Sequence, residues 1–318
     1  MYKILLTPRA FHTYGMKILS SEKFKNFNFV INDTGKQYDA KTFAKLASDV
    51  DGIIVSVDRI DKNLLENCHK LKAIVKFGTG LDNVDLVSAK EKNISVSNTK
   101  GSNAQSVAEL TLGLILASSR HIVSSSLQVK KGLWNKPTGI EVKDKTVGII
   151  GFGTIGQKVA KLLSPFNVKV LVYDVYDVPK EVLNQYSSTQ VDFNTVLQCS
   201  DIITIHVPLT PQTENLIGYQ QICMMKSSSI LVNMSRGGIV NENHLLMALK
   251  DKKIYSAASD VFSHEPPLAI DVEQELLTRD DFILTPHIGS RTVESEINTI
   301  HQSLEEIEAL LTHHCSPT

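Results

Sequence analysis

The chain has 318 residues, with 33 lysines and arginines against 34 aspartates and glutamates. This balance gives no broad basic field, which disfavours nucleic acid or an acidic lipid surface as a partner. The most apolar helical stretch, residues 107–117, contains Glu109 and is too short to cross a membrane. The cysteines form no CxxC pair and no Cys/His cluster with zinc spacing: Cys68, Cys199, Cys223 and Cys315. We expect a cytoplasmic protein with reduced thiols and no metal.

Short runs rich in β-branched residues alternate with amphipathic segments along the chain, which indicates parallel sheets covered by helices on both faces. A long helical pattern, Ser102–Gly132, is predicted to connect two such α/β sets. A last helix is predicted over Thr292–His313. The predicted strands are Lys3–Leu6, Gly52–Val55, Ala73–Lys76, Thr146–Ile150, Lys169–Tyr173, Ile202–His206, Ser229–Asn233 and Phe282–Thr285.

The most specific local signal is a glycine-rich turn after the strand that ends at Ile150. There an apolar run leads into the spacing Gly-X-Gly-X-X-Gly and then into a helical pattern, which is typical of a dinucleotide-binding turn. Gly151 permits the tight turn, Gly153 lets a pyrophosphate approach the backbone, and Gly156 lets helix and strand pack closely. The start of the following helix offers N–H groups to the phosphates.

The next predicted strand is followed by Asp174, 18 residues after Gly156. A carboxylate at this place accepts hydrogen bonds from the adenosine ribose and repels a 2′-phosphate, which favours NAD over NADP. Two other interpretations stay open from these residues alone. One is a glycine-rich turn with a solvated aspartate, and the other is a site for another nucleotide ligand such as S-adenosylmethionine.

Arg236 follows the predicted strand Ser229–Asn233 and precedes two glycines. Ligands of open parallel sheets bind beyond the carboxyl ends of the strands, so Arg236 is predicted to face the ligand. Its guanidinium suits the bidentate binding of a carboxylate. Taken alone, the same residue is equally an exposed arginine in a loop that leads into a helix.

Glu265 precedes two prolines, and His287 follows the predicted strand Phe282–Thr285. Taken singly, such a glutamate is more often solvated and such a histidine more often structural. Together with Arg236 they form a set typical of oxidoreductases. When a hydride leaves a carbon, a base has to take the proton of its hydroxyl, and imidazole suits this near neutral pH. A neighbouring carboxylate orients the ring and stabilises imidazolium.

These motifs together resemble the D-isomer-specific 2-hydroxyacid dehydrogenases, and the likeness runs over nearly the whole chain. The segments that carry it are KFGTGLDNVDL (76–86), NTKGSNAQSVAELTLGLIL (98–116), VGIIGFGTIGQKVA (147–160), HVPLT (206–210), NMSRGGIVNE (233–242), SDVFSHEPP (259–267) and TPHIGS (285–290).

The resemblance implies an α/β fold of two Rossmann-like domains with parallel sheets and a cleft between them. The substrate-binding domain would span residues 1–99, completed by 288–318. The NAD-binding domain would span residues 100–287. The resemblance also implies a homodimer, with the long first helix of the cofactor domain in the interface.

In such enzymes, the arginine matching Arg236 binds the substrate carboxylate and the histidine matching His287 is the acid/base. The glutamate matching Glu265 pairs with that histidine. Besides the three glycines and Asp174, the positions matching the cofactor site are Thr79, Thr154, Ile155, Val207, Pro208, Met234, Ser235 and Asp260. The positions matching the substrate loop include Lys76, Phe77 and Gly78.

Residues 76–86 most resemble the D-3-phosphoglycerate dehydrogenases, which favours 3-phosphoglycerate and 3-phosphohydroxypyruvate as substrates and a place in serine biosynthesis. The phosphate would be a second anion, for which Lys76 and Lys136 are the candidate cations, unless both are solvated surface lysines. Glyoxylate, hydroxypyruvate and D-lactate are the alternative substrates. Formate is disfavoured, because relatives that oxidise it carry an amide where Glu265 stands. The alternative from another class is a non-catalytic NAD-sensing module like the corepressors that share this fold.

Overall fold

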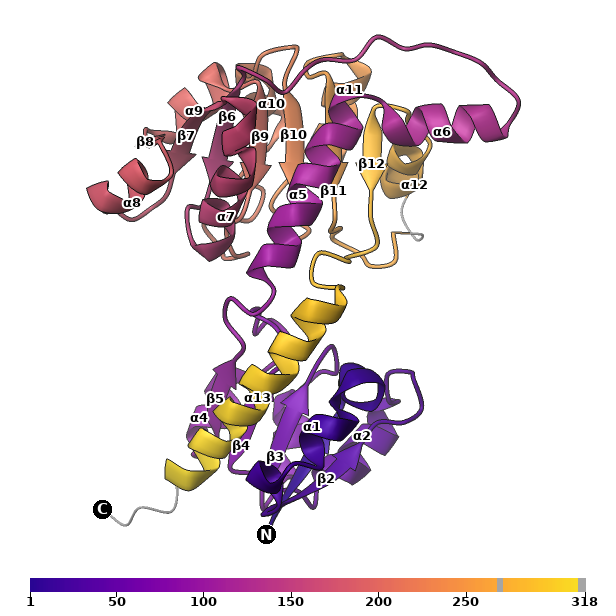
Figure 1. Cartoon of the computed structure of the whole chain (residues 1–318). Helices are drawn as coiled ribbons and strands as arrows, with labels where there is room; N and C mark the ends of the chain where they lie inside the picture. Colours follow the sequence, from indigo (N-terminus) through magenta and orange to yellow (C-terminus); the bar gives the residue numbers. More distant parts are fainter. Residues whose placement is uncertain (268–270, 314–318) are drawn as a thin grey trace. The chain divides into compact units, whose positions relative to one another are not determined.

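The protein is described here from a computed structural model that covers residues 1–267 and 271–313. Cys315, one of the predicted free thiols, lies outside the described residues. The chain divides into two compact units (Figure 1). Unit 1 contains Met1–Asn103 and the chain from Arg291 on, and unit 2 contains Ala104–Ser290. The sequence predicts domain boundaries after residues 99 and 287, and the structure has the boundaries between its units after residues 103 and 290.

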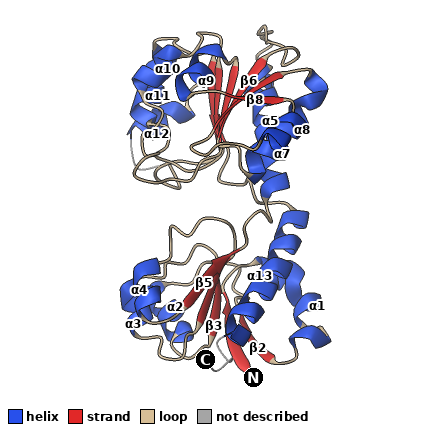
Figure 2. Ribbon diagram, turned by 90° about the vertical axis from the view of Figure 1, so that its left-hand side faces the viewer, coloured by secondary structure: helices blue, strands red, loops and turns tan. Residues whose placement is uncertain are grey.

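Unit 1 is a parallel sheet of five strands in the order β2-β1-β3-β4-β5. Figure 2 shows α2, α3 and α4 on one side of this sheet and α1 and α13 on the other. The strands are β1 Tyr2–Leu6, β2 Phe27–Ile31, β3 Gly52–Val55, β4 Ala73–Lys76 and β5 Ser95–Asn98. The helices are α1 Met16–Leu19, α2 Ala40–Ala47, α3 Lys62–Glu66, α4 Leu86–Glu91 and α13 Val293–His313.

Three helices of unit 1 begin at an aspartate that caps the helix. Asp39, Asp61 and Asp85 precede α2, α3 and α4, and each carboxylate accepts the N–H three residues further on. Such a cap pairs one of the backbone donors that every helix start leaves open, and it stabilises a helix by about 1 kcal/mol. The caps therefore help these short helices form on one face of the sheet.

Unit 2 is a parallel sheet of seven strands in the order β12-β11-β10-β9-β6-β7-β8. The strands are β6 Thr146–Ile150, β7 Lys169–Tyr173, β8 Ser188–Gln190, β9 Ile202–Ile205, β10 Ile230–Asn233, β11 Ser256–Ser259 and β12 Phe282–Leu284. The helices are α5 Ala104–Ser119, α6 Ile122–Lys130, α7 Thr154–Leu163, α8 Lys180–Gln185, α9 Phe193–Cys199, α10 Tyr219–Met224, α11 Glu242–Lys250 and α12 Asp271–Leu277.

The sheet of unit 2 has an apolar core on each face. One cluster includes Ile205, Leu231 and Leu246, and the other includes Ile149, Val172 and Val232. In Figure 2, α9 to α12 cover one face, while α5, α7 and α8 cover the other. Both faces of these strands are thus buried, which explains their unbroken apolar runs.

The register of this sheet brings five strand ends into one row. Ile150, Ile205, Asn233, Ser259 and Leu284 lie side by side on neighbouring strands. The loops that follow β6, β9, β10, β11 and β12 therefore leave the sheet at the same edge. Sheet order changes direction between β6 and β9, which is where open α/β sheets bind ligands.

The structure corrects several sequence-based predictions of elements. The helix predicted over Ser102–Gly132 is two helices, α5 and α6, because His121 adopts a left-handed conformation with φ 51° between them. Four strands were not predicted. Among them, β11 consists only of serine and alanine, so it lacks the β-branched residues that mark a strand.

Candidate active site

The glycine-rich turn joins β6 to α7 at the switch point of the unit 2 sheet. Gly151 has φ +94°, and a Cβ there would lie 2.8 Å from the carbonyl carbon of His206. A Cβ on Gly156 would lie 2.3 Å from the carbonyl oxygen of Gly151. Both positions therefore exclude a side chain, one through backbone conformation and contact and the other through close packing of helix on strand.

The turn has the form of a phosphate cradle. A Cβ on Gly153 would meet no heavy atom within 4 Å, so the space beside this residue is open. Gly153 is also the N-cap of the ten-residue helix α7, and no side chain of the described residues caps that helix end. Thr154 is exposed and Ile155 half-buried at the same end. The residues present thus fit a dinucleotide pyrophosphate, which would take hydrogen bonds from the first N–H groups of α7.

Asp174 follows β7 and is tied to the glycine-rich turn. Its Oδ2 accepts the N–H of Phe152 at 2.8 Å, and its Oδ1 accepts that of Tyr176 at 3.2 Å. This bond to the turn was not expected from sequence. Asp174 therefore helps hold the phosphate cradle, in addition to the ribose binding predicted for it.

The β9 strand ends one residue earlier than predicted, and His206 follows it. The backbone N–H of His206 donates to the carbonyl of Ile150 at 2.7 Å. Both of its ring nitrogens are buried without a hydrogen-bond partner among the described residues. Burial lowers the pKa of His206 to about 3, so the ring is neutral at physiological pH. Val207, half-buried, and Pro208, exposed, extend this loop beside Gly151.

Arg236 lies in the loop between β10 and α11, next to the buried residues Met234 and Ser235. Its Nη1 donates to the carbonyl of Ser235 at 2.8 Å, and the amide of Asn233 donates to the carbonyl of Arg236 at 3.0 Å. These bonds fix the backbone from which the guanidinium projects, and the side chain is half-buried.

Glu265 and His287 come from different loops and meet. Nδ1 of His287 lies 2.8 Å from Oε2 of Glu265, and both side chains are partly exposed. Burial alone would raise the pKa of Glu265, but the hydrogen bond and charge of His287, the N–H of Phe262 and the charge of Arg236 lower it below its usual value. The carboxylate is thus ionised at neutral pH, and it is under the electrostatic influence of both other members of the predicted set.

Asp260 holds the loop that carries His287. Its carboxylate is 3% exposed and accepts the N–H groups of Ile288 at 2.9 Å and Gly289 at 2.7 Å and the hydroxyl of Thr285 at 2.5 Å. The N–H of His287 donates to the carbonyl of Asp260 at 2.9 Å. These bonds keep His287 in a left-handed conformation, with φ 52°. This supporting role was missed because β11, whose end places Asp260, was not recognised.

The other predicted site residues are spread over both units. Lys76 ends β4 in unit 1, where its ammonium donates to the carbonyl of Ser56. Phe77, Gly78 and Thr79 follow, with Gly78 at φ +126° and its N–H bound to the hydroxyl of Thr99 at 2.7 Å. Lys136 belongs to unit 2, on the exposed segment after α6.

Within residues 1–267 and 271–313, no helix is both long and apolar enough to span a bilayer. No group of three or more His, Cys, Asp or Glu side chains in the same part of the chain is placed to share a metal ion.

Comparison with known proteins agrees with this geometry. Residues 112–289 match the family model of the D-isomer specific 2-hydroxyacid dehydrogenase, NAD binding domain. D-3-phosphoglycerate dehydrogenase of Methanocaldococcus jannaschii is 43% identical over 78% of this chain, which spans only 47% of that protein. Hydroxypyruvate reductase of Thermotoga maritima is 39% identical over 86% of this chain and 89% of its own length.

One solved structure is similar to this protein over the full length of the chain. The NAD-dependent formate dehydrogenase of Staphylococcus aureus, solved in complex with NAD, is 31% identical with a TM-score of 0.82, over 100% of this chain and 97% of that one. A glycine-rich nucleotide turn at the switch point of a parallel α/β sheet is characteristic of NAD-dependent oxidoreductases. Within that class, the chain belongs to the D-isomer-specific 2-hydroxyacid dehydrogenase family, and its cofactor is NAD.

Proposed function

We propose that this protein moves a hydride between NAD and C2 of a small 2-hydroxy or 2-keto acid. The observation that carries the proposal is the 2.8 Å contact between Glu265 and His287, which lies at the same sheet edge as the glycine-rich turn. Arg236 is near enough to lower the pKa of Glu265. An acid–base pair, an anion-binding cation and a nucleotide cradle are the parts that such a reaction needs.

Each of the three side chains has a definite task in this proposal. Nδ1 of His287 is bound to Glu265, which leaves Nε2 to give a proton to the C2 oxygen in reduction and to take it back in oxidation. The Glu265 carboxylate keeps the ring oriented and stabilises its protonated form. Arg236 binds the substrate carboxylate. When NAD is bound, its nicotinamide ring supplies the hydride chemistry.

We further propose 3-phosphohydroxypyruvate and 3-phosphoglycerate as the substrate pair, with a place in serine biosynthesis. The support is the likeness to the M. jannaschii enzyme and the two lysines, Lys76 and Lys136, that would bind the phosphate. Relatives named for hydroxypyruvate and formate make other small acids the competing substrates. Formate is disfavoured, because the relatives that oxidise it carry an amide where this chain has Glu265.

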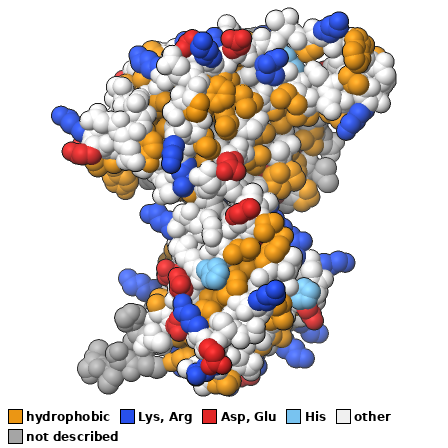
Figure 3. Space-filling view, viewed as in Figure 1, with side chains coloured by type: hydrophobic (Ala, Val, Ile, Leu, Met, Phe, Trp, Pro, Cys, Tyr) orange, Lys and Arg blue, Asp and Glu red, His pale blue; other side chains and the backbone are white. Residues whose placement is uncertain are grey.

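We also propose that the protein is a cytoplasmic homodimer. Support for the dimer comes from α6 and the segment after it, which expose large apolar side chains: Ile122, Val123, Leu127, Val129, Leu133 and Trp134. Apolar side chains gather on the face of unit 2 that carries α5 and α6 (Figure 3). A second copy would cover this surface, since large exposed apolar patches mark interaction sites. The free thiols of Cys68, Cys199 and Cys223 are typical of a reducing compartment.

The test is NADH consumption with a panel of 2-keto acids: 3-phosphohydroxypyruvate, hydroxypyruvate, glyoxylate and pyruvate. We expect turnover, with the highest kcat/KM for the phosphorylated acid. A preference for an unphosphorylated acid would contradict the proposed substrate but not the proposed class of reaction. If the protein binds NADH but turns over none of these acids, the proposed activity is wrong and an NAD-sensing module is the better interpretation.

A further inference from the structure

The segment Phe262–Glu265, which carries Glu265, is held by a second carboxylate outside the pair described above. Glu242 is the first residue of α11, and its Oε1 accepts the N–H of Ser263 at 2.7 Å. The preceding N–H, that of Phe262, donates to Oε1 of Glu265 at 3.1 Å. Two consecutive backbone N–H groups are thus bound by two carboxylates, and one of these carboxylates contacts His287.

The same peptide also packs against the Arg236 loop without any free space. A Cβ on Gly237 would lie 2.0 Å from the carbonyl carbon of Phe262 and 2.3 Å from the nitrogen of Ser263. A displacement of the Phe262–Ser263 peptide would therefore move both Glu265 and the loop that carries Arg236. The peptide that Glu242 binds is therefore the place where the loop of Arg236 contacts the loop of Glu265.

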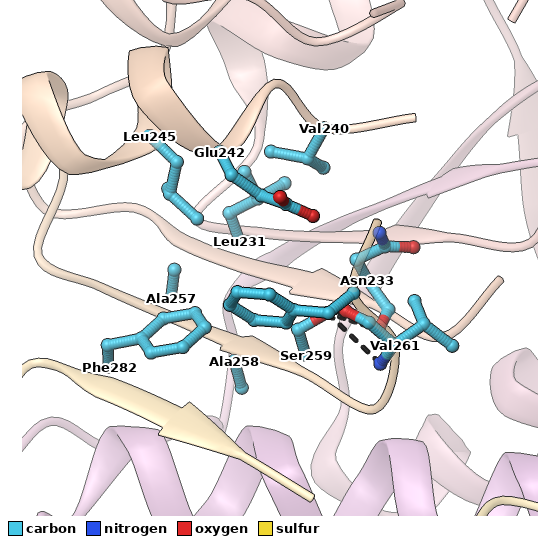
Figure 4. Close-up of a pocket in the computed structure, with 11 residues that line it drawn as sticks. Leu231, Asn233, Val240, Glu242, Leu245, Ala257, Ala258, Ser259, Val261 and Phe282 are labelled. Carbon is cyan, nitrogen blue, oxygen red and sulfur yellow. Dashed lines mark hydrogen bonds between the residues drawn. The ribbon is translucent and has the colours of Figure 1, made fainter. Parts of the chain in front are cut away.

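Glu242 reaches this peptide across a small pocket. Figure 4 shows its carboxylate pointing into a space that is also lined by Asn233, Val240 and Val261. The cavity is about 10 Å³, at or below the space that one water molecule needs. Ser263 itself is exposed, so replacing Glu242 with an apolar side chain of equal size removes the carboxylate that fixes this N–H and leaves it to water.

Charged groups surround Glu242 from two neighbouring elements. Burial raises its pKa, the N–H of Ser263 and the charge of His264 oppose the rise, and the carboxylate of Glu273 on α12 adds to it. Glu273 is 1% exposed, and its Oε1 lies 2.9 Å from Nδ1 of His264. Ser263 and His264 are consecutive, so glutamates from α11 and α12 hold this segment at adjacent residues.

We propose that Glu242 is a positioning residue of the reaction: by binding the N–H of Ser263, it fixes the loop that presents Glu265 to His287. The inference rests on the proposed function of that pair. Glu242 need not touch the substrate. The charges that act on Glu265 come from His287 and Arg236, so Glu242 works through the backbone.

The test compares two substitutions of equal length at this position. Glu242→Gln keeps an oxygen acceptor for Ser263, and Glu242→Met fills the same space without an acceptor. The matched control is Glu275→Gln on α12, where a partly exposed glutamate pairs with Lys250 at the surface. For the full chain of each variant, we would measure NADH affinity, kcat and KM for the best keto acid, and the pH at which the reduction rate is half-maximal.

We expect Glu242→Met to lower kcat by about tenfold with little change in KM, since displacement of a catalytic group by about 1 Å costs up to 10²-fold. The half-maximal pH should move to lower values, toward that of Glu265→Gln, because the carboxylate no longer holds protonated His287. NADH affinity should be unchanged. Glu242→Gln and Glu275→Gln should behave as the wild type.

Other outcomes would overturn the inference. If both Glu242 variants shift the pH profile equally, the charge of Glu242, and not its hydrogen bond to Ser263, influences His287. If neither shifts it, or if Glu242→Met loses NADH binding as well, the residue is merely structural. A Glu265→Gln variant that shifts the profile while Glu242→Met does not would leave the proposed function intact. If Glu265→Gln itself has no effect, the role proposed for the Glu265–His287 pair has failed, whereas the proposed function as a whole fails only if no keto acid is turned over.

Discussion

His287 and Glu265 stand 22 positions apart in the chain, yet Nδ1 of the one lies 2.8 Å from Oε2 of the other. The contact uses one ring nitrogen and leaves Nε2 for the substrate. His287→Ala should therefore lower kcat by about 10²–10⁴-fold, the usual worth of a general acid or base. NADH affinity, measured by fluorescence titration, should stay near that of the wild type. His301→Ala, at an exposed position on α13, is the control. An equal loss of NADH affinity would point to a structural histidine.

Glu265→Gln should move the pH dependence of both reaction directions to lower pH. His287, the Phe262 N–H and Arg236 lower the pKa of Glu265 against the effect of burial, so the wild-type carboxylate is charged at neutral pH. Its removal destabilises protonated His287. Reduction needs that proton and should fade earlier as pH rises, while oxidation should persist to lower pH. We expect a shift of about one pH unit, since both side chains are partly exposed. An unmoved profile would contradict the pairing.

Asp174 should set the choice of cofactor. Asp174→Ala should weaken NAD binding by roughly 1.5–3 kcal/mol, the worth of a hydrogen bond to a charged acceptor, and should relax discrimination against NADP. Because Asp174 also binds the N–H of Phe152, Asp174→Asn is the informative partner variant. It keeps an acceptor for the turn and removes the charge that repels a 2′-phosphate. Dissociation constants for both cofactors measure this, and a wild type that prefers NADPH would refute it.

Lys76→Ala should raise the KM for 3-phosphohydroxypyruvate by about tenfold or more, the loss expected for one charged hydrogen bond. The unphosphorylated keto acids never make this contact, so their KM should not change. Lys90→Ala, at an exposed position on α4, serves as the control. Steady-state kinetics with both kinds of substrate decide the matter. An equal effect on phosphorylated and plain acids would show that Lys76 is not a phosphate ligand.

Asp201 should stabilise unit 2 in a pH-dependent way. Its carboxylate accepts the N–H of Thr146 at 2.9 Å and pairs with Lys226 at 2.8 Å. Burial would raise the pKa of Asp201, but these partners lower it below 3.8. Asp201→Ala should cost about 1–3 kcal/mol at pH 7, because it leaves the Thr146 N–H unpaired.

The lowered pKa of Asp201 fixes how its contribution to the free energy of unfolding changes with pH. The contribution of Asp201 is complete above the unfolded value of 3.8 and is lost as pH falls through the folded pKa. Urea unfolding of wild type and variant should thus converge in acid. Asp49→Ala, at a surface ion pair, should change stability far less. A gap between wild type and Asp201→Ala that persists in acid would rule out the linkage.

The sequence by itself determined the family, the parallel α/β class and the cofactor. These features depend on short-range patterns that survive without coordinates. Gly151, Gly153 and Gly156 stand within six residues, and an apolar strand and a helical pattern flank them directly. Arg236, Glu265 and His287 were predicted as a set from their combined chemistry, and the family segments that contain them gave each a role.

Where local patterns are weak, the elements themselves were missed. The β11 strand has no β-branched residue, and the break between α5 and α6 depends on the left-handed conformation of His121, which no glycine or proline marks. Both features are imposed by packing against neighbouring elements. Element type at such places is therefore set by tertiary contacts more than by intrinsic propensity.

Only the tertiary structure decided which side chains support the candidate site. Asp260 binds the N–H of Gly289 29 residues away, and Glu242 binds that of Ser263 21 residues away. Such bonds form because strand order and register bring three loop ends to one sheet edge. A sequence pattern shows how residues are spaced within one helix or strand. These hydrogen bonds join residues of different loops, and the distance between those loops is set only when the sheet has formed.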